Sequence, residues 1–248
     1  MKNRIQYVLI LVTAGIFFCG TAWAAPINQI AYASLTGTEI ITFDDVAGGP
    51  APGINYDGLF ESGYTTFGEH FLGQTVTNSS GFDVISGTPS GGGLTLQTGT
   101  AGNNLGIYNY STNVMYGLGS LGYPDYDAIG EGAFSVLFDF DQSQFGFQLV
   151  GGDGGSATVD FFKRDGSLID SIIISSLSEA YYGFERDLAV KDIAGISLYN
   201  SDPAGIGFDN LLHDVAGVPD NSTVPEPATF ILLGSGLAGL AFYRRKRK

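Results

Sequence analysis

The sequence predicts an all-β protein built as an antiparallel, jelly-roll-like β-sandwich. Short runs of β-branched and aromatic residues recur between residues 36 and 215, and turns rich in glycine and asparagine separate them. The composition agrees, because 37 glycines and 13 tyrosines with only 15% charged residues suit short strands and tight turns. No helical periodicity interrupts these runs, so we expect strands paired antiparallel in two packed sheets.

Ten runs are expected to form strands: residues 38–43, 74–77, 93–97, 105–108, 134–140, 144–150, 157–162, 168–174, 193–198 and 206–211. The clearest pairing joins 157–162 to 168–174, because Asp165-Gly166 between them is a strong hairpin signal. Residues 27–35 are expected to form a short helix or to stay irregular. The glycine-rich residues 151–155 are expected to form a mobile turn, since no Lys-Ser/Thr pair and no helix follow as a phosphate loop requires. Residues 45–130 are expected to hold longer loops, where function usually lies.

The first 24 residues have the pattern of a signal peptide. Lys2 and Arg4 precede an apolar run at residues 5–19, and the small-x-small sequence Ala22-Trp23-Ala24 predicts cleavage between Ala24 and Ala25. The alternative is a retained membrane helix. The only cysteine, Cys19, follows Phe18 rather than a small residue, which argues against lipidation. A mature chain without cysteine excludes cysteine catalysis and Cys-ligated zinc.

The interior of the chain is strongly acidic. All 25 acidic residues lie between Glu39 and Glu226, with only four basic residues among them, which gives a net charge of −21. Such a field repels nucleic acid and anionic lipid, so we predict no nucleic-acid partner. It attracts divalent cations, and it also simply keeps an exterior protein soluble.

The other end of the sequence has three parts. Pro225, Glu226 and Pro227 precede an uncharged apolar run at residues 228–243, and five basic residues follow. As a helix the apolar run would measure roughly 24 Å, and flanking Tyr243 and Arg244 would help it cross a bilayer of about 30 Å with the basic cluster inside. We therefore predict a single C-terminal transmembrane helix, with a buried core helix as the alternative. Residues 214–224 have the composition of a linker.

This three-part pattern resembles a PEP-CTERM sorting signal, here at residues 225–248. The resemblance implies that Pro225, Glu226 and Pro227 are recognised by an exosortase, a membrane peptidase whose system commonly accompanies exopolysaccharide or biofilm production. It implies export across the inner membrane, anchoring there before processing, and a cell-surface or extracellular location afterwards. Residues 25–213 would be the exterior domain. Their strand order resembles carbohydrate-binding-like β-sandwiches, from the Ile-Thr-Phe-Asp run at 41–44 to the closing Gly-Ile-Gly-Phe-Asp-Asn-Leu run at 205–211.

A calcium site is one hypothesis for the exterior domain. If the first and last strands pair, Asp44, Asp45, Asp209 and Asn210 could converge, and such oxygen donors suit Ca²⁺. The alternative is that these side chains cap turns or bind backbone amides.

We predict no catalytic residues and no enzyme activity. Only His70 and His213 could act as histidine bases, and no zinc-binding or nucleophile-elbow motif is present. A non-enzymatic binding or structural role, associated with exopolysaccharide, is the main hypothesis. It rests on loop aromatics that could stack on sugar rings or instead fill the core: Tyr56, Phe60, Tyr64, Phe67, Tyr108, Tyr110, Tyr116, Tyr123 and Tyr126. A secreted polysaccharide hydrolase is the alternative. A cleft with two carboxyls, one of raised pKa, would favour that hydrolase, whereas a flat aromatic platform would favour binding.

Overall fold

The computed structural model describes residues 26–214. The predicted signal peptide with its Ala24–Ala25 cleavage site, and the predicted sorting signal with its transmembrane helix, lie outside these residues. The strands are β1 (Ile27–Ile30), β2 (Glu39–Ile41), β3 (Ile54–Tyr56), β4 (Phe60–Ser62), β5 (Thr65–Gly68), β6 (His70–Phe71), β7 (Thr75–Ser79), β8 (Phe82–Ser86), β9 (Leu96–Gln97), β10 (Leu105–Asn109), β11 (Asn113–Gly117), β12 (Phe134–Gln142), β13 (Gln144–Phe162), β14 (Leu168–Arg186), β15 (Ile193–Asn200) and β16 (Ile206–His213). Three short 3₁₀ turns accompany them: η1 (Tyr32–Ser34), η2 (Tyr126–Ala128) and η3 (Asp187–Ala189).

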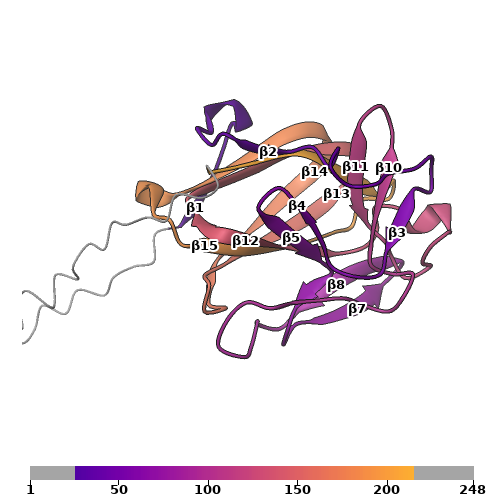
Figure 1. The fold of residues 1–248 in the computed structure, drawn as a ribbon, viewed down its shortest axis with the longest axis horizontal. Coiled ribbons are helices and arrows are strands. Elements are labelled where there is room, and N and C mark those ends of the chain that lie inside the picture. The colour runs from indigo at the N-terminus through magenta and orange to yellow at the C-terminus, as the bar shows by residue number, and fades with distance from the viewer. Residues whose placement is uncertain (1–25, 215–248) are drawn as a thin grey trace, which may run out of the picture. The chain divides into compact units, whose positions relative to one another are not determined.

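Twelve of these strands form one hydrogen-bonded sheet, and every strand pair within residues 26–214 is antiparallel. The long hairpin of β13 and β14 organises the sheet (Figure 1). The first part of β13 pairs with β16, which continues to β11, β10 and β3. The last part of β13 pairs with β15, and β12, β5 and β4 follow in that order. The all-β, antiparallel prediction is confirmed, but the two arms belong to one continuous sheet rather than to the two separate sheets that were expected.

The two arms of this sheet enclose an aromatic core. Phe134 of β12 lies against Phe208 of β16 with ring centroids 4.6 Å apart, so side chains from opposite arms meet. Phe147 packs on Phe208 at 5.2 Å, and Phe161 packs on Phe184 at 5.3 Å. Buried aromatic rings contribute large apolar areas, and truncating one to alanine typically costs about 3–5 kcal/mol. This core can hold the domain without disulfides.

The predicted hairpin between β13 and β14 is confirmed. The amide of Lys163 donates to the carbonyl oxygen of Ser167 at 2.9 Å, and Gly166 has a φ of +85°. The glycine-rich residues 151–155, however, do not form a separate turn, so that prediction is wrong. They lie inside β13, where the pairing with β14 shifts between Leu149 and Asp153. Four glycines here have positive φ, which lets β13 bulge and bend as it passes from one arm to the other.

The ends of the domain also differ from expectation. Ile27–Ile30 forms a strand, β1, paired with the last residues of β14, and only η1 after it is helical. Asp214, expected to begin the linker, is buried: its carboxylate accepts hydrogen bonds from Ser143 and Gln144 at 2.6–2.9 Å. The folded domain therefore includes Asp214.

Candidate functional site

The calcium hypothesis required the first and last predicted strands to pair, and the corresponding strands β2 and β16 do so. In the register of β2 and β16, Ile41 lies opposite Leu211. Asp44 then comes near Asp209: burial raises the pKa of the Asp209 carboxyl, and the negative charge of Asp44 adds to the rise. Asp209 already accepts hydrogen bonds from the Thr112 hydroxyl at 2.9 Å and the Asn210 amide at 2.7 Å.

The other two predicted ligands have separate partners. Asp45 accepts from the Ser62 hydroxyl at 2.6 Å and from the Gly63 amide at 3.2 Å. The Asn210 side-chain amide donates to Gln148 at 2.7 Å. Across residues 26–214 there is no group of three or more His, Cys, Asp or Glu side chains placed to hold a metal ion. Calcium binding stays a prediction, and the hydrogen bonds seen are those of the turn-capping alternative.

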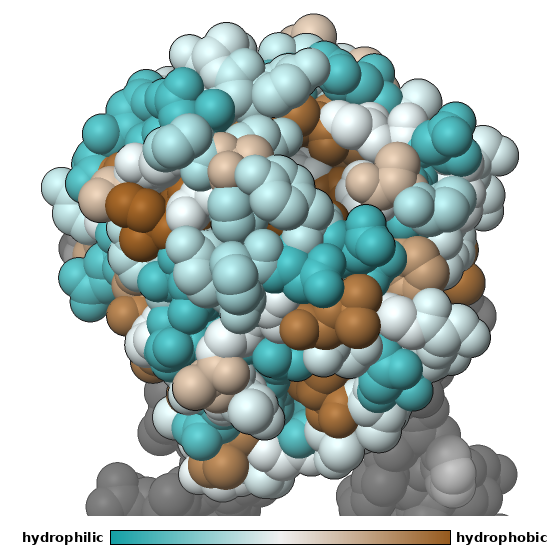
Figure 2. All heavy atoms as spheres, turned by 90° about the vertical axis from the view of Figure 1, so that its right-hand side faces the viewer, coloured by the Kyte–Doolittle hydropathy of each residue, from teal (hydrophilic) through white to brown (hydrophobic). Residues whose placement is uncertain are grey.

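The loop aromatics divide into core and surface residues. Phe60, Phe67 and Tyr116 are buried, whereas Tyr64, Tyr110, Tyr123 and Tyr126 are exposed. Figure 2 shows the side of the molecule that carries β3 and β10; it is mostly hydrophilic, with apolar residues in separate small areas. Among residues 26–214, no broad apolar platform is visible on that face.

One exposed ring is held rigidly. The hydroxyl of Tyr126 donates to the carbonyl oxygen of Ala51 at 2.8 Å, and the hydroxyls of Tyr116 and Tyr123 donate to the neighbouring carbonyls of Pro52 and Gly53. Tyr126 is 63% exposed although its hydroxyl is fixed. A ring fixed in this way loses little conformational entropy when a ligand stacks on it.

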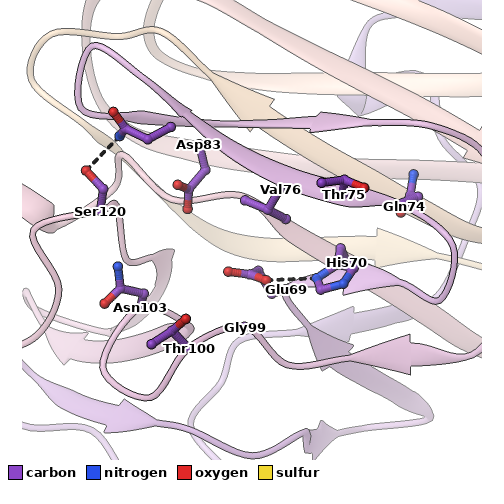
Figure 3. Close-up of a pocket in the computed structure, with 11 residues that line it drawn as sticks. Glu69, His70, Gln74, Thr75, Val76, Asp83, Gly99, Thr100, Asn103 and Ser120 are labelled. Atoms are coloured by element: carbon purple, nitrogen blue, oxygen red, sulfur yellow. Dashed lines mark hydrogen bonds and ion pairs between the residues drawn. The ribbon is translucent and has the colours of Figure 1, made fainter.

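A polar pocket of about 440 Å³ (Figure 3) lies beside the β7–β8 hairpin, whose β8 strand packs against β15. Four segments distant in sequence form it. The β5–β6 junction provides Glu69 and His70, the β7–β8 hairpin provides Asp83, and loops 98–104 and 118–122 provide Asn103 and Ser120. In Figure 3 the Asp83 carboxyl points between Ser120, Asn103 and Glu69 into the pocket.

The β7–β8 hairpin places Asp83 by strand alternation. Ser79 lies opposite Phe82, and the two turn residues, Ser80 and Gly81, both have positive φ, as a tight two-residue hairpin turn requires. Along β8, Asp83 and Ile85 are buried while their neighbours are partly exposed. An aspartate therefore occupies a position that the strand pattern would give to an apolar residue.

A buried polar network supports the pocket from behind. The hydroxyls of Ser135 on β12 and Ser197 on β15 lie 2.8 Å apart, and Ser197 donates to the Gln74 side-chain oxygen at 3.1 Å. The same oxygen accepts from the Phe71 amide at 2.8 Å. Gln74 lines the pocket and is only 6% exposed, yet its side-chain nitrogen has no hydrogen-bond partner in the part of the chain described. Unpaired buried donors are rare in folded proteins, so an ordered water or an oxygen atom of a ligand would satisfy this nitrogen.

The two carboxyls of the pocket differ in their surroundings. Glu69 pairs with Nδ1 of His70 at 2.8 Å. The Glu69 carboxylate also lies against Gly99. A Cβ atom at position 99 would overlap this carboxylate, so the site requires glycine there. Asp83 is 5% exposed, and burial raises its pKa from 3.8 to about 7. The charge of Glu69 is the second cause, and that of Glu131 is a smaller one.

A second pocket adjoins the first. Its volume is about 660 Å³, and its lining includes Tyr126, Asp127 and Glu131. Ser120 lines both pockets and accepts a hydrogen bond from the Asn78 side chain at 2.6 Å. Burial, followed by the charges of Asp127 and then Asp125, raises the pKa of Glu131. The two pockets together present carboxyls, amides and hydroxyls beside one rigid aromatic ring.

Sequence reasoning selected His70 and Tyr126 but missed Glu69 and Asp83. The alternation of residues 82–85 was the available signal for Asp83, since it places that residue on the same face as Ile85. No local signal brings Glu69 to it, because their approach depends on how the β7–β8 hairpin packs on the sheet.

Comparison with known families identifies the end of the sequence. Residues 223–248 match the PEP-CTERM protein-sorting motif, two residues more than predicted. No curated protein and no solved structure matches the chain. Within residues 26–214 there is no helix with the length and apolar character needed to cross a membrane. The chain thus carries a PEP-CTERM protein-sorting motif at residues 223–248, which marks it as an exported exosortase substrate with a membrane-anchoring sorting signal.

Proposed function

We propose that this exosortase substrate is a non-enzymatic polysaccharide-binding protein of the cell surface or extracellular matrix, and that the two adjoining pockets hold the sugar chain. The adjoining pockets are the observation that carries the proposal. They combine the hydrogen-bonding side chains of Asn78, Asn103 and Ser120 with the exposed ring of Tyr126. Sugar recognition uses such a combination, because amides and hydroxyls pair with sugar hydroxyls while a flat ring covers the apolar face of the sugar.

Two further observations support the proposal. The sorting motif implies export, and the resemblance noted above associates exosortases with exopolysaccharide production. The two pockets, of about 440 and 660 Å³, also share Ser120 in their linings, so neighbouring units of one sugar chain could reach both. Before processing, the protein would be anchored in the inner membrane, and afterwards it would act at the surface or outside the cell.

A glycan array tests this function. The full chain, solubilised in a mild detergent, is applied beside a Tyr126→Ala variant. Tyr110→Ala is the matched control, because Tyr110 is similarly exposed, at 65%, but lines neither pocket. We expect binding to oligosaccharides that Tyr126→Ala weakens about tenfold, equivalent to about 1.4 kcal/mol, and that Tyr110→Ala leaves unchanged. Absence of glycan binding, or equal effects of the two variants, would contradict the proposal.

A polysaccharide hydrolase is the second candidate, and one observation favours it. A glycosidase needs a protonated carboxyl as acid and an ionised one as base or nucleophile, and Asp83 with its raised pKa faces the same pocket as Glu69. The two candidates differ in their products. Release of new reducing ends from a bound polysaccharide, abolished in Asp83→Asn, would establish the hydrolase. Binding without such release would leave the non-enzymatic function.

A further inference from the structure

The pockets contain more acidic than basic side chains in the part of the chain that the structure describes. Glu69 and Asp83 line the first pocket, Asp127 and Glu131 line the second, and no lysine or arginine of residues 26–214 lines either one. Three of the four basic residues of the domain form ion pairs elsewhere, with Asp141 and Asp192: Lys163, Arg164 and Arg186. Among residues 26–214, His70 is therefore the one possible cation that lines the first pocket.

Several polar atoms of the first pocket also lack partners. The only side-chain hydrogen bond of Asp83 within residues 26–214 comes from the Ala133 amide to Oδ2, at a long 3.4 Å, and Oδ1 accepts none. Glu69 uses one carboxylate oxygen for His70 and leaves the other without a donor in the same part of the chain. The Gln74 side-chain nitrogen is unpaired as well, but as a donor it can pair only with an oxygen atom of a ligand and not with a cation. The free oxygens of Asp83 and Glu69 are not among the fully buried polar atoms without a partner, so they are open to a donor from a ligand in the pocket.

We propose that the first pocket selects an amino sugar, with the free ammonium group of a deacetylated hexosamine unit bound between Asp83 and Glu69. This inference rests on the proposed function and names the ligand class. An ammonium group has three donors and one positive charge, which matches two carboxyls with free oxygen atoms. Asn103 and Ser120 line the same pocket and can exchange hydrogen bonds with neighbouring sugar hydroxyls. An anionic polysaccharide is excluded from the same pocket by repulsion.

Binding of a cation should also release a proton. Below neutral pH the free pocket holds a proton on Asp83, because burial and the charges of Glu69 and Glu131 raise its pKa to about 7. The other titratable group at the pocket is His70, which is paired with Glu69. An ammonium group beside Asp83 favours the ionised carboxylate, so the proton leaves as the ligand binds. Neutral sugars supply no such charge and should release no proton.

Calorimetry with the full chain at pH 6 tests the inference. The probes are a glucosamine pentamer, the N-acetylglucosamine pentamer, cellopentaose, spermine and calcium chloride, each measured in two buffers of different ionisation enthalpy. We expect the glucosamine pentamer to bind at least about tenfold more tightly than either neutral oligosaccharide. Its apparent enthalpy should depend on the buffer, which reports the released proton.

Two variants locate the effect. Asp83→Asn should weaken glucosamine binding about tenfold and abolish the buffer dependence, and Glu69→Gln should weaken binding through the other carboxyl. Asp139→Asn is the control, because it removes one negative charge from an exposed residue outside both pockets.

The outcomes separate the two proposals. Equal binding of neutral and aminated oligosaccharides would overturn the amino-sugar inference and keep polysaccharide binding. Binding of spermine as tightly as the pentamer, an equal effect of Asp139→Asn, or calcium binding in place of the sugar would also overturn the inference. No binding of any oligosaccharide would overturn both.

Discussion

Replacing Asp83 with asparagine should stabilise the protein above neutral pH. The buried carboxyl keeps its proton in the folded state up to a pH of about 7, whereas in the unfolded chain it releases the proton near pH 3.8. The unfolded state is therefore favoured progressively as the pH rises from about 4 to 7, and the loss of stability is complete above 7. Asparagine has the same shape and no charge, so it removes this loss.

The size of the effect follows from the same shift. A change in pKa from 3.8 to about 7 corresponds to about 4 kcal/mol. Since the pocket opens to solvent, screening reduces this, and we expect Asp83→Asn to raise the free energy of unfolding by about 2–3 kcal/mol at pH 8. At pH 4, where the folded-state carboxyl is already neutral, the gain should be close to zero.

Urea denaturation at pH 4.5, 6 and 8 measures this difference. Asp139→Asn is the control, since it removes an exposed carboxylate and should change stability little at any of these values. A variant whose advantage over the wild type does not grow with pH would refute the reasoning. So would a gain of equal size in the control, because that would indicate relief of general repulsion rather than of burial.

Four other perturbations have defined outcomes. Burial lowers the pKa of His213 from 6.5 to about 4, so as the pH falls the imidazole is protonated in the unfolded chain before it is protonated in the folded one. The free energy of unfolding should therefore drop by about 3 kcal/mol between pH 6.5 and 4. Acid denaturation of His213→Phe should show a smaller drop. Arg186 is 2% exposed and binds a carboxylate through two hydrogen bonds of 2.6 and 2.7 Å, so Arg186→Met should cost about 3–5 kcal/mol in urea denaturation, and a loss below 1 kcal/mol would contradict a buried pair. If calcium is structural, a chelator should lower the Tm and added calcium should restore it, whereas an unchanged melt removes the site. Alanine at Pro225, Glu226 and Pro227 should leave the unprocessed chain in the inner membrane, and normal release of this variant in cell fractionation would contradict its role as the exosortase signal.

The strands that could be predicted from the sequence are those with long alternation. β12, β15 and β16 lie where expected, because each is eight or nine residues long and largely buried. Strands β3, β4 and β6, which are two or three residues long and lie among glycines, escaped prediction, and so did β8 and β11, of five residues each. Such short strands form when the sheet around them provides partners, and that information is not local.

The glycine-rich residues 151–155 show a different limit. Glycine marks positive φ in both a turn and a bulge, so composition alone does not distinguish the two. What decides is that the β14 residues opposite, including Leu177 and Ser178, continue to pair through the bulge. The strand can only be recognised as continuous once its partner is known.

The candidate site shows the same division between local and distant information. Asp83 could be assigned to a buried face from the alternation of β8, since Ile85 shares that face. Glu69 lies fourteen positions earlier in the numbering, and it reaches the same pocket because the β7–β8 hairpin folds over the outer side of the sheet. Sequence reasoning could therefore name residue types for a site but not the pairing that gives the site its chemistry.

The arrangement of polar groups in the domain separates stability from binding. Between the two arms the buried side chains are predominantly apolar, with rings such as Phe147 and Phe208 in contact, and this layer holds the fold. On the outer side of β12 and β15 a second buried layer combines an apolar cluster, formed by Phe71, Leu96 and Phe162, with the hydrogen-bonded side chains of Ser135, Ser197 and Gln74. Apolar residues at the three polar positions would give a more stable protein, because unpaired buried polar atoms cost free energy. Polar groups kept at such a cost are typical of sites that a ligand completes, and so the outer layer, rather than the aromatic core, is where binding should be sought.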